Sequence, residues 1–214
     1  PNPRGFTAKD LVMLDRVSAP QFSPDGGRIL YALRETNWEA DRGVGSLWVT
    51  DASGGHGTRL TPADLPASAG AWSPDGAFVY FLSAKSGSMQ VWRVPAGGGD
   101  ATQVTAYPLD VGSFRLAPDC KAIAVSFDVF ADCATLACTA ERHAANANDK
   151  RTGVQYDRIF VRHWDTWKDG TRSQVFLGAL GDDGKATGEP RLLTTGIDGD
   201  VPGKPFGDQS DYVF

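Results

Sequence analysis

The sequence predicts an all-β fold built as a partial β-propeller, with about three blades, the start of a fourth and a short N-terminal helix. The main observation is a repeated Ser-Pro-Asp-Gly phrase, complete at 22–26 and 72–76 and decayed to Leu-Ala-Pro-Asp-Cys at 116–120. The prolines of these phrases are 50 and 44 residues apart. A period of about 40–50 residues that opens with a strand, a turn and a strand is typical of propeller blades.

The residues around each phrase support the same fold. Proline presets φ at the first central turn position, aspartate tolerates the second, and glycine supplies the positive φ that leaves the turn. Cys120 occupies that glycine position in the third phrase, which predicts either a strained φ or another turn type. Short apolar runs at 29–33, 78–82 and 123–127 follow the turns and predict buried strands. Second strands are expected at 47–49, 91–94 and 175–177, and closing phrases at 59–61, 103–105 and 191–194.

The predicted domain organisation follows from the repeat. Residues 1–18 form a capped helix and lead-in, and residues 19–214 form the incomplete propeller. Its blade-like units span 19–66, 67–110 and 111–197, and 198–214 begin the next unit. Thr7 can cap the helix and Asp10 can reach back to it, so we expect a helix that runs to about Arg16. Because three units cannot close a ring, we expect the chain to be a piece of a longer polypeptide.

The third unit is longer than the others. About 35–40 residues are inserted near 128–165, and long insertions into a rigid scaffold are commonly functional or disordered. Cys133 and Cys138 lie in this insertion among small and polar residues. They predict a disulfide that closes a tight loop in an oxidising compartment, or else two reduced surface thiols. Cys120 is left over as a half-buried thiol.

Composition and motifs exclude several classes of function. A net charge of −5 and a pI near 5.1 argue against a nucleic-acid partner. No apolar run approaches the roughly 18 residues of a membrane span. The sequence contains no Gly-x-Ser-x-Gly nucleophile elbow and no recognisable metal motif. It therefore predicts no catalytic residue, no metal and no cofactor in this chain.

One cluster of candidate binding residues stands at the end of the insertion, at 156–167. Aromatic rings beside a carboxylate suit a peptide amine through cation–π and ion-pair contacts. The candidate substrate-binding residues are Asp165, Trp164, Trp167 and His163. In the alternative interpretation, the two tryptophans pack the blade and the charged residues pair at its rim. Those charged residues are Asp157, Arg158, Arg162 and Asp165.

Three stretches carry a family resemblance: Phe-Thr-Ala-Lys-Asp-Leu at 6–11, the phrase at 16–26, and Arg-His-Trp-Asp-Thr-Trp at 162–167. With the cysteine-bearing insertion, they resemble the start of prolyl-oligopeptidase-family (S9) serine peptidases, most of all bacterial dipeptidyl-peptidase 5-like and acylaminoacyl-peptidase-like members. The resemblance implies a seven- or eight-bladed propeller over a C-terminal α/β-hydrolase domain that carries Ser, Asp and His. No position here matches those three residues.

The resemblance also implies a role. Such a propeller admits short peptides to an active site that removes dipeptides or acyl-amino acids from peptide N-termini. The expected partners are these peptides and the hydrolase domain of the same polypeptide, with a homo-oligomer allowed. The expected location is periplasmic or secreted. The alternative is a TolB-like, non-enzymatic propeller that binds protein partners, because such propellers share the Ser-Pro-Asp-Gly repeats.

Overall fold

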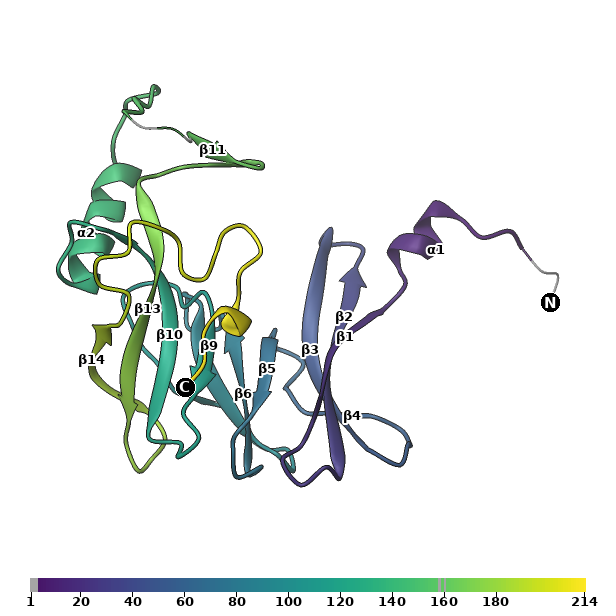
Figure 1. Cartoon of the computed structure of the whole chain (residues 1–214). Coiled ribbons are helices and arrows are strands. Elements are labelled where there is room, and N and C mark those ends of the chain that lie inside the picture. The colour runs from purple at the N-terminus through teal and green to yellow at the C-terminus, as the bar shows by residue number, and fades with distance from the viewer. Residues whose placement is uncertain (1–3, 158, 160) are drawn as a thin grey trace. The chain divides into compact units, whose positions relative to one another are not determined.

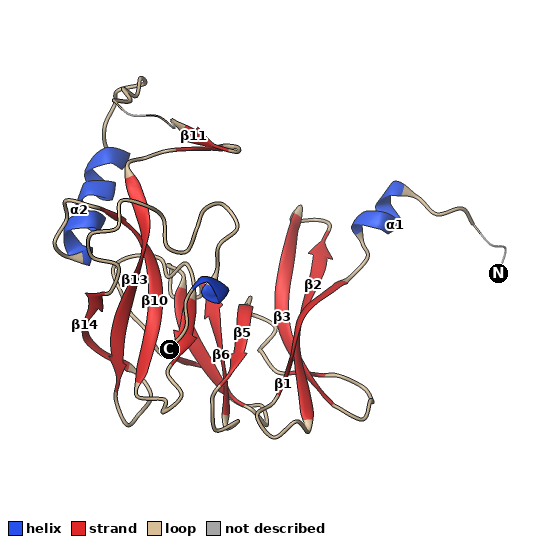
Figure 2. Ribbon diagram, viewed as in Figure 1, coloured by secondary structure: helices blue, strands red, loops and turns tan. Residues whose placement is uncertain are grey.

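The computed structural model of the chain describes residues 4–157, 159 and 161–214. Its strands form three four-stranded sheets and one two-stranded hairpin, drawn as red arrows in Figure 2. The described strand pairs within these sheets are antiparallel. Within each four-stranded sheet the strands follow one another in chain order, as in a propeller blade. The predicted mostly-β fold is therefore confirmed.

Most of the elements are labelled in Figure 1. The first sheet holds β1 (Arg16–Phe22), β2 (Arg28–Asn37), β3 (Arg42–Asp51) and β4 (Thr58–Arg59). The second holds β5 (Ser68–Trp72), β6 (Phe78–Ser83), β7 (Gln90–Pro95) and β8 (Thr102–Gln103). The third holds β9 (Phe114–Leu116), β10 (Ala122–Phe130), β13 (Thr171–Leu180) and β14 (Ala186–Leu192). The remaining elements are α1 (Ala8–Val12), α2 (Leu136–Ala147), the hairpin strands β11 (Arg162–His163) and β12 (Thr166–Trp167), and the 3₁₀ turn η1 (Gln209–Asp211).

The chain divides into two compact units. The first contains the chain up to Gly87 together with Val91–Gln103, and the second contains Ser88–Gln90 and Val104–Phe214. The first unit has one core of buried apolar side chains from its two sheets, including Leu30, Leu47, Val79, Phe81 and Val94. Their burial is the main stabilising contribution to this unit.

The core of the second unit is centred on Phe127 of β10. Its ring packs edge-to-face against Tyr107 and Phe176, with centroids 5.3 and 5.4 Å away. This arrangement places the positive edge of one ring on the negative face of the next and adds to the gain from burial. The apolar run predicted at 123–127 is thus a buried central strand.

Each of the two complete Ser-Pro-Asp-Gly turns contains the same pattern of hydrogen bonds. In the second turn, the Ser73 hydroxyl donates to Asp75 at 2.5 Å and accepts from the backbone amide of Phe78 at 2.9 Å. Asp75 also accepts from the amide of Ala77 at 3.0 Å. The first turn repeats these bonds with Ser23. The serine therefore ties the turn to the first residue of the strand that follows.

The third turn lacks this serine but keeps its shape. Asp119 accepts from the amide of Lys121 at 3.0 Å, and Ala117 stands where the other turns have serine. Cys120 has a φ of 57°, beside 71° at Gly26 and 69° at Gly76. Of the two outcomes expected for Cys120, the structure has the strained φ, since an L-residue is disfavoured in this region.

The segments that leave the second and third sheets are attached by the same pair of bonds. Val111 donates its amide to the Met89 carbonyl at 2.8 Å, while Asp110 accepts from the Met89 amide at 2.7 Å. After the third sheet, Val201 and Asp200 make the same two bonds to Ser173, at 2.8 and 2.9 Å. The chain beyond β14 therefore begins along the same path as the chain beyond β8.

The N-terminal helix is shorter than expected. Its capping box is present, because Thr7 accepts from the Asp10 amide and Asp10 accepts from the Thr7 amide. The expectation that it runs to about Arg16 was wrong: α1 ends at Val12, and Arg16 already begins β1. The Val12 carbonyl accepts from the Thr36 hydroxyl at 2.7 Å, and pairing of β1 with β2 prevents further winding.

The segment 198–214, expected to start a fourth unit, contains η1 and no strand among its described residues. It is nevertheless attached to the third sheet. The Tyr212 hydroxyl lies 2.9 Å from the Ser113 hydroxyl, and Arg115 donates to the Gln209 carbonyl at 3.1 Å. These contacts place the end of the chain beside β9.

Candidate functional site

The candidate site lies where the insertion leaves and rejoins the third sheet. β10 and β13 pair without interruption from Ala122–Ala179 to Phe130–Thr171. Residues 131–170 therefore leave and return at adjacent positions, and they carry α2 and the β11–β12 hairpin (Figure 1). The sequence did not predict α2, although an alanine-rich run after a threonine is a usual start for a helix.

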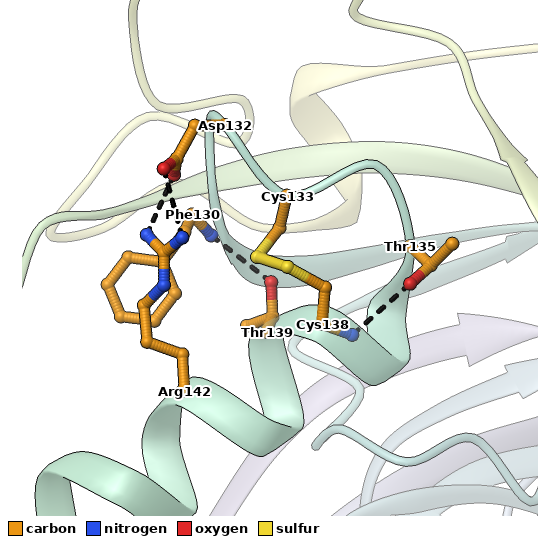
Figure 3. Close-up of a disulfide and its surroundings, with 7 residues drawn as sticks. All are labelled: Phe130, Asp132, Cys133, Thr135, Cys138, Thr139 and Arg142. Carbon is orange, nitrogen blue, oxygen red and sulfur yellow. Dashed lines mark hydrogen bonds and ion pairs between the residues drawn. A yellow bond between two sulfur atoms is a disulfide. The ribbon is translucent and has the colours of Figure 1, made fainter.

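The start of α2 is tied to the end of β10 (Figure 3). Cys133 and Cys138 form a disulfide with an S–S distance of 2.02 Å. Thr135 caps the helix by accepting from the Cys138 amide at 3.2 Å. The buried hydroxyl of Thr139 accepts from the Phe130 amide at 3.3 Å. Of the two states left open for this cysteine pair, the structure has the bonded one.

The predicted aromatic residues lie on the hairpin. Arg162 pairs with Trp167 and His163 with Thr166, so Trp164 and Asp165 form the turn between β11 and β12. Trp164 has a φ of 49° and is 76% exposed, and Trp167 is 60% exposed. The alternative in which both tryptophans pack the blade is therefore not what the structure has.

Among the charged members that the structure describes, Asp157, Arg162 and Asp165 form no ion pair with one another, unlike what that alternative expected. The Arg162 guanidinium lies 5.5 Å above the Trp167 ring, and Trp167 stacks on Tyr156 at 6.2 Å. Asp165 accepts from the Thr166 hydroxyl at 3.3 Å. Asp157 accepts from the Gln155 amide at 3.0 Å. Arg158 and the side chain of His163 lie outside the part of the chain that the structure describes.

A cleft of about 730 Å³ opens beside the hairpin in the second unit. One side is formed by Thr166 and Trp167 of β12, another by Ala140 and His143 of α2, and the floor by strand residues such as Phe127. Of the predicted binding residues whose side chains the structure describes, only Trp167 lines the cleft. Trp164 and Asp165 lie at the turn beyond its wall. This volume suits a short peptide or a small molecule.

Most charges around the cleft are neutralised by pairing. Lys204 contacts Asp128 at 2.6 Å, and Lys168 contacts Asp200 at 3.0 Å. Burial raises the pKa of Asp200, but the Ser173 amide and Lys168 outweigh it and leave that pKa below its ordinary value. The cleft wall is therefore held by ion pairs that persist at neutral pH.

Asp169 is the exception among these carboxylates. Its Oδ1 accepts from the Thr171 hydroxyl at 2.6 Å and from the Thr171 amide at 2.9 Å. Burial raises the pKa of Asp169, but these bonds, with a smaller contribution from the charge of His143, hold it below its ordinary value. An ionised carboxylate, an imidazole and the Trp167 ring therefore line the same cleft. Of this set, the carboxylate and the Trp167 ring are the groups that can contact a cationic part of a ligand favourably.

A second cavity, of about 770 Å³, shares Lys168, Asp169 and Lys204 with the cleft and extends to Tyr156 and Asp157. The sequence analysis missed His143 and Asp169 as site residues. Helical spacing of Ala140 and His143 would have placed these two on one face. Nothing local to the sequence indicates Asp169, because its position depends on strand pairing.

The described residues contain neither a metal-binding cluster nor a membrane-spanning helix. No three His, Cys, Asp or Glu side chains there gather so as to hold a metal ion. Nor does any helix in that part of the chain have the length and apolar character needed to cross a membrane.

The chain belongs to the TolB β-propeller domain family, whose model matches residues 12–131. It is 24% identical, over 97% of its length, to dipeptidyl-peptidase 5 of Porphyromonas endodontalis, of which it covers 29%. It is 30% identical, over 56% of its length, to the uncharacterized peptidase YuxL of Bacillus subtilis, of which it covers 19%. The chain thus spans less than a third of these relatives.

The fold also resembles a solved peptidase. The acylaminoacyl peptidase of Pyrococcus horikoshii superposes on 88% of this chain with a TM-score of 0.61, at 13% identity and over 26% of its own length. The predicted resemblance to peptidase propellers is confirmed by these relatives.

Proposed function

We propose that the chain is the substrate-gating propeller segment of an S9 serine peptidase that removes dipeptides or acyl-amino acids from the N-termini of short peptides. The observation that carries this proposal is the similarity to dipeptidyl-peptidase 5 along 97% of the chain, which includes the insertion. In this role the chain supplies no catalytic group. The nucleophile, base and acid belong to a C-terminal α/β-hydrolase domain of the same polypeptide.

In this role the cleft is the place where the peptide substrate binds. A short peptide lies across Phe127 and Trp167, and the hairpin above contacts its N-terminal end. Asp165 then receives the free amine, while Trp164, Trp167 and His163 contact the residues beside it. An amine that enters this region also meets the ionised Asp169. Desolvation between aromatic rings strengthens such ion pairs.

The disulfide supports a location outside the reducing cytosol. Cys133 and Cys138 form a disulfide. Disulfides persist in the periplasm or after secretion and are rare in the cytosol. We therefore place the protein in the periplasm or outside the cell. The net charge of −5 favours peptide partners over nucleic acid. Assembly into a homo-oligomer is compatible with this role.

The first test applies a fluorophosphonate probe to the full-length protein. The proposal expects covalent labelling at a serine beyond this chain, inside a Gly-x-Ser-x-Gly turn. It also expects release of dipeptides or acyl-amino acids from short peptides. A polypeptide that continues only with further blades, or that the probe does not label, would overturn the proposal.

The second test addresses the hairpin. Asp165→Ala in the full-length protein should raise KM at least tenfold for peptides with a free amine and leave kcat nearly unchanged. The matched control is Asp182→Ala, an exposed aspartate on the turn between β13 and β14. An unchanged KM in the Asp165 variant would remove Asp165 from the binding site.

A second candidate function is a non-enzymatic propeller that binds protein partners. It is favoured by the family match itself, which is described as a TolB β-propeller domain. It does not account for the similarity to a peptidase that continues through residues beyond 131. A protein that is silent toward the probe but retains a stable protein partner would favour this candidate.

A further inference from the structure

The inference concerns how helix α2 is held at the cleft, and it rests on the function proposed above. Ala140 and His143 lie three residues apart on one face of α2, and both line the cleft. Any shift of this helix therefore changes the shape of the cleft. The position of the helix depends on its attachment to the rest of the unit.

Much of that attachment is to one place, the stretch 130–133 that begins at the last residue of β10 (Figure 3). Arg142 donates to both carboxylate oxygens of Asp132, at 2.8 and 2.9 Å, and its guanidinium lies 4.6 Å above the Phe130 ring. The same ring lies 5.1 Å from the imidazole of His143. Phe130 thus fixes the side chain that reaches the cleft.

The links in this attachment differ in strength. The Asp132 side chain is 72% exposed, and exposed ion pairs contribute little because water screens them. The Thr139 bond to the Phe130 amide is long, at 3.3 Å. The Cys133–Cys138 bond is the only covalent link among those described, and it fixes the first turn of α2 beside the strand that the other two links use. Without it, the first turn of α2 keeps the long Thr139 bond and the buried side chain of Leu136.

We propose that the Cys133–Cys138 disulfide positions Ala140 and His143 at the cleft and makes peptide binding there depend on its redox state. A dithiol reduces the bond by thiol–disulfide exchange: the protein S–S bond breaks, two cysteine thiols form, and the dithiol becomes a disulfide. Both sulfurs belong to half-buried residues that a small dithiol can reach. Reduction then releases the first turn of α2, and His143 leaves the cleft wall.

The test uses the full-length protein and a dye-labelled pentapeptide with a free amine, whose second peptide bond is replaced by a methyleneamine so that it cannot be cleaved. Fluorescence anisotropy gives its Kd before and after dithiothreitol treatment. Alkylation under denaturing conditions counts the thiols of this segment, one when oxidised and three when reduced. The expected result is a rise in Kd of at least fivefold on reduction, and its reversal on reoxidation.

A readout that does not depend on binding accompanies this measurement. Hydrogen exchange of the backbone amides of 137–143 should accelerate at least tenfold on reduction, while exchange in β10 and β13 stays unchanged. The double variant Cys133→Ser/Cys138→Ser should behave as the reduced protein does. The matched control is Cys120→Ser, which leaves the disulfide intact.

The outcomes separate the two proposals. Equal exchange in the oxidised and reduced proteins, or an equal Kd in the two states of a protein that binds the peptide, would overturn the positioning role. Failure of the oxidised protein to bind the pentapeptide would count against the proposed function. In that case, accelerated exchange in α2 would still support the positioning role, and unchanged exchange would overturn it.

Discussion

Replacement of Ser73 by alanine tests whether the serine of the repeated phrase stabilises its blade. The Ser73 hydroxyl donates to Asp75 at 2.5 Å and accepts from the Phe78 amide at 2.9 Å. The bond from this hydroxyl is the largest cause that holds the pKa of Asp75 below its ordinary value. Alanine removes both bonds and leaves the Phe78 amide without this acceptor at the start of β6.

The magnitude follows from those two bonds. A neutral intramolecular hydrogen bond contributes about 1 kcal/mol net, and one to a charged group about 1.5–3 kcal/mol. Asp75 is mostly exposed, so its bond counts near the lower end. We therefore expect Ser73→Ala to lower the free energy of unfolding by about 2 kcal/mol. In the third turn, Ala117→Ser restores the missing hydroxyl beside Asp119. This substitution should raise the free energy of unfolding by about 1 kcal/mol.

The assay is urea unfolding followed by tryptophan fluorescence, with the slope m compared between variants to check that the unfolded states match. Hydrogen exchange of the Phe78 amide gives a local readout. Ser53→Ala, on an exposed turn, is the control and should change the free energy of unfolding by less than about 0.5 kcal/mol. A Ser73→Ala variant as stable as this control would refute the reasoning.

Three further predictions concern other positions. Cys120→Gly should stabilise the third turn by up to about 1 kcal/mol in urea unfolding, because glycine tolerates its φ of 57°; a loss of stability would contradict this. Gly45→Ala should cost about 1–3 kcal/mol, since a Cβ there would stand 2.5 Å from the Ala67 carbonyl oxygen, and an unchanged urea midpoint would contradict it. The stabilisation that Asp200 draws from its depressed pKa is present above about pH 4 and should fade as pH falls through its folded-state pKa. The protection of backbone amides near Lys168, measured against their intrinsic exchange rates at each pH, should then fall in acid in the native protein but not in Asp200→Asn.

Repetition made the fold predictable. Ser-Pro-Asp-Gly fixes a turn through bonds that span only a few residues, so the phrase identifies each hairpin wherever it occurs. The same local logic correctly predicted the capping box of Thr7 and Asp10. It failed at the end of that helix, because the pairing of Arg16 with Arg34 joins residues far apart in sequence.

The candidate site was less predictable for the same reason. The sequence indicated the aromatic stretch, yet only strand pairing brings Trp167 and Asp169 to one cleft with His143. Neither Asp165 nor Trp164 is distinguished from its neighbours by local pattern, because their places depend on a two-residue turn at the end of a hairpin. A site whose residues come together only through strand pairing cannot be predicted from the periodicity of the sequence.

The uninterrupted pairing of β10 with β13 has a consequence for how such a blade can change. Phe130 and Thr171 already stand opposite each other, so the intervening residues 131–170 are not required to bring them together. Lengthening a closed loop adds only a slowly rising entropic cost. Residues 131–170 can therefore be shortened or replaced while the pairing of β10 with β13 stays intact, so the part of the chain that borders the cleft is separable from the sheet that supports it.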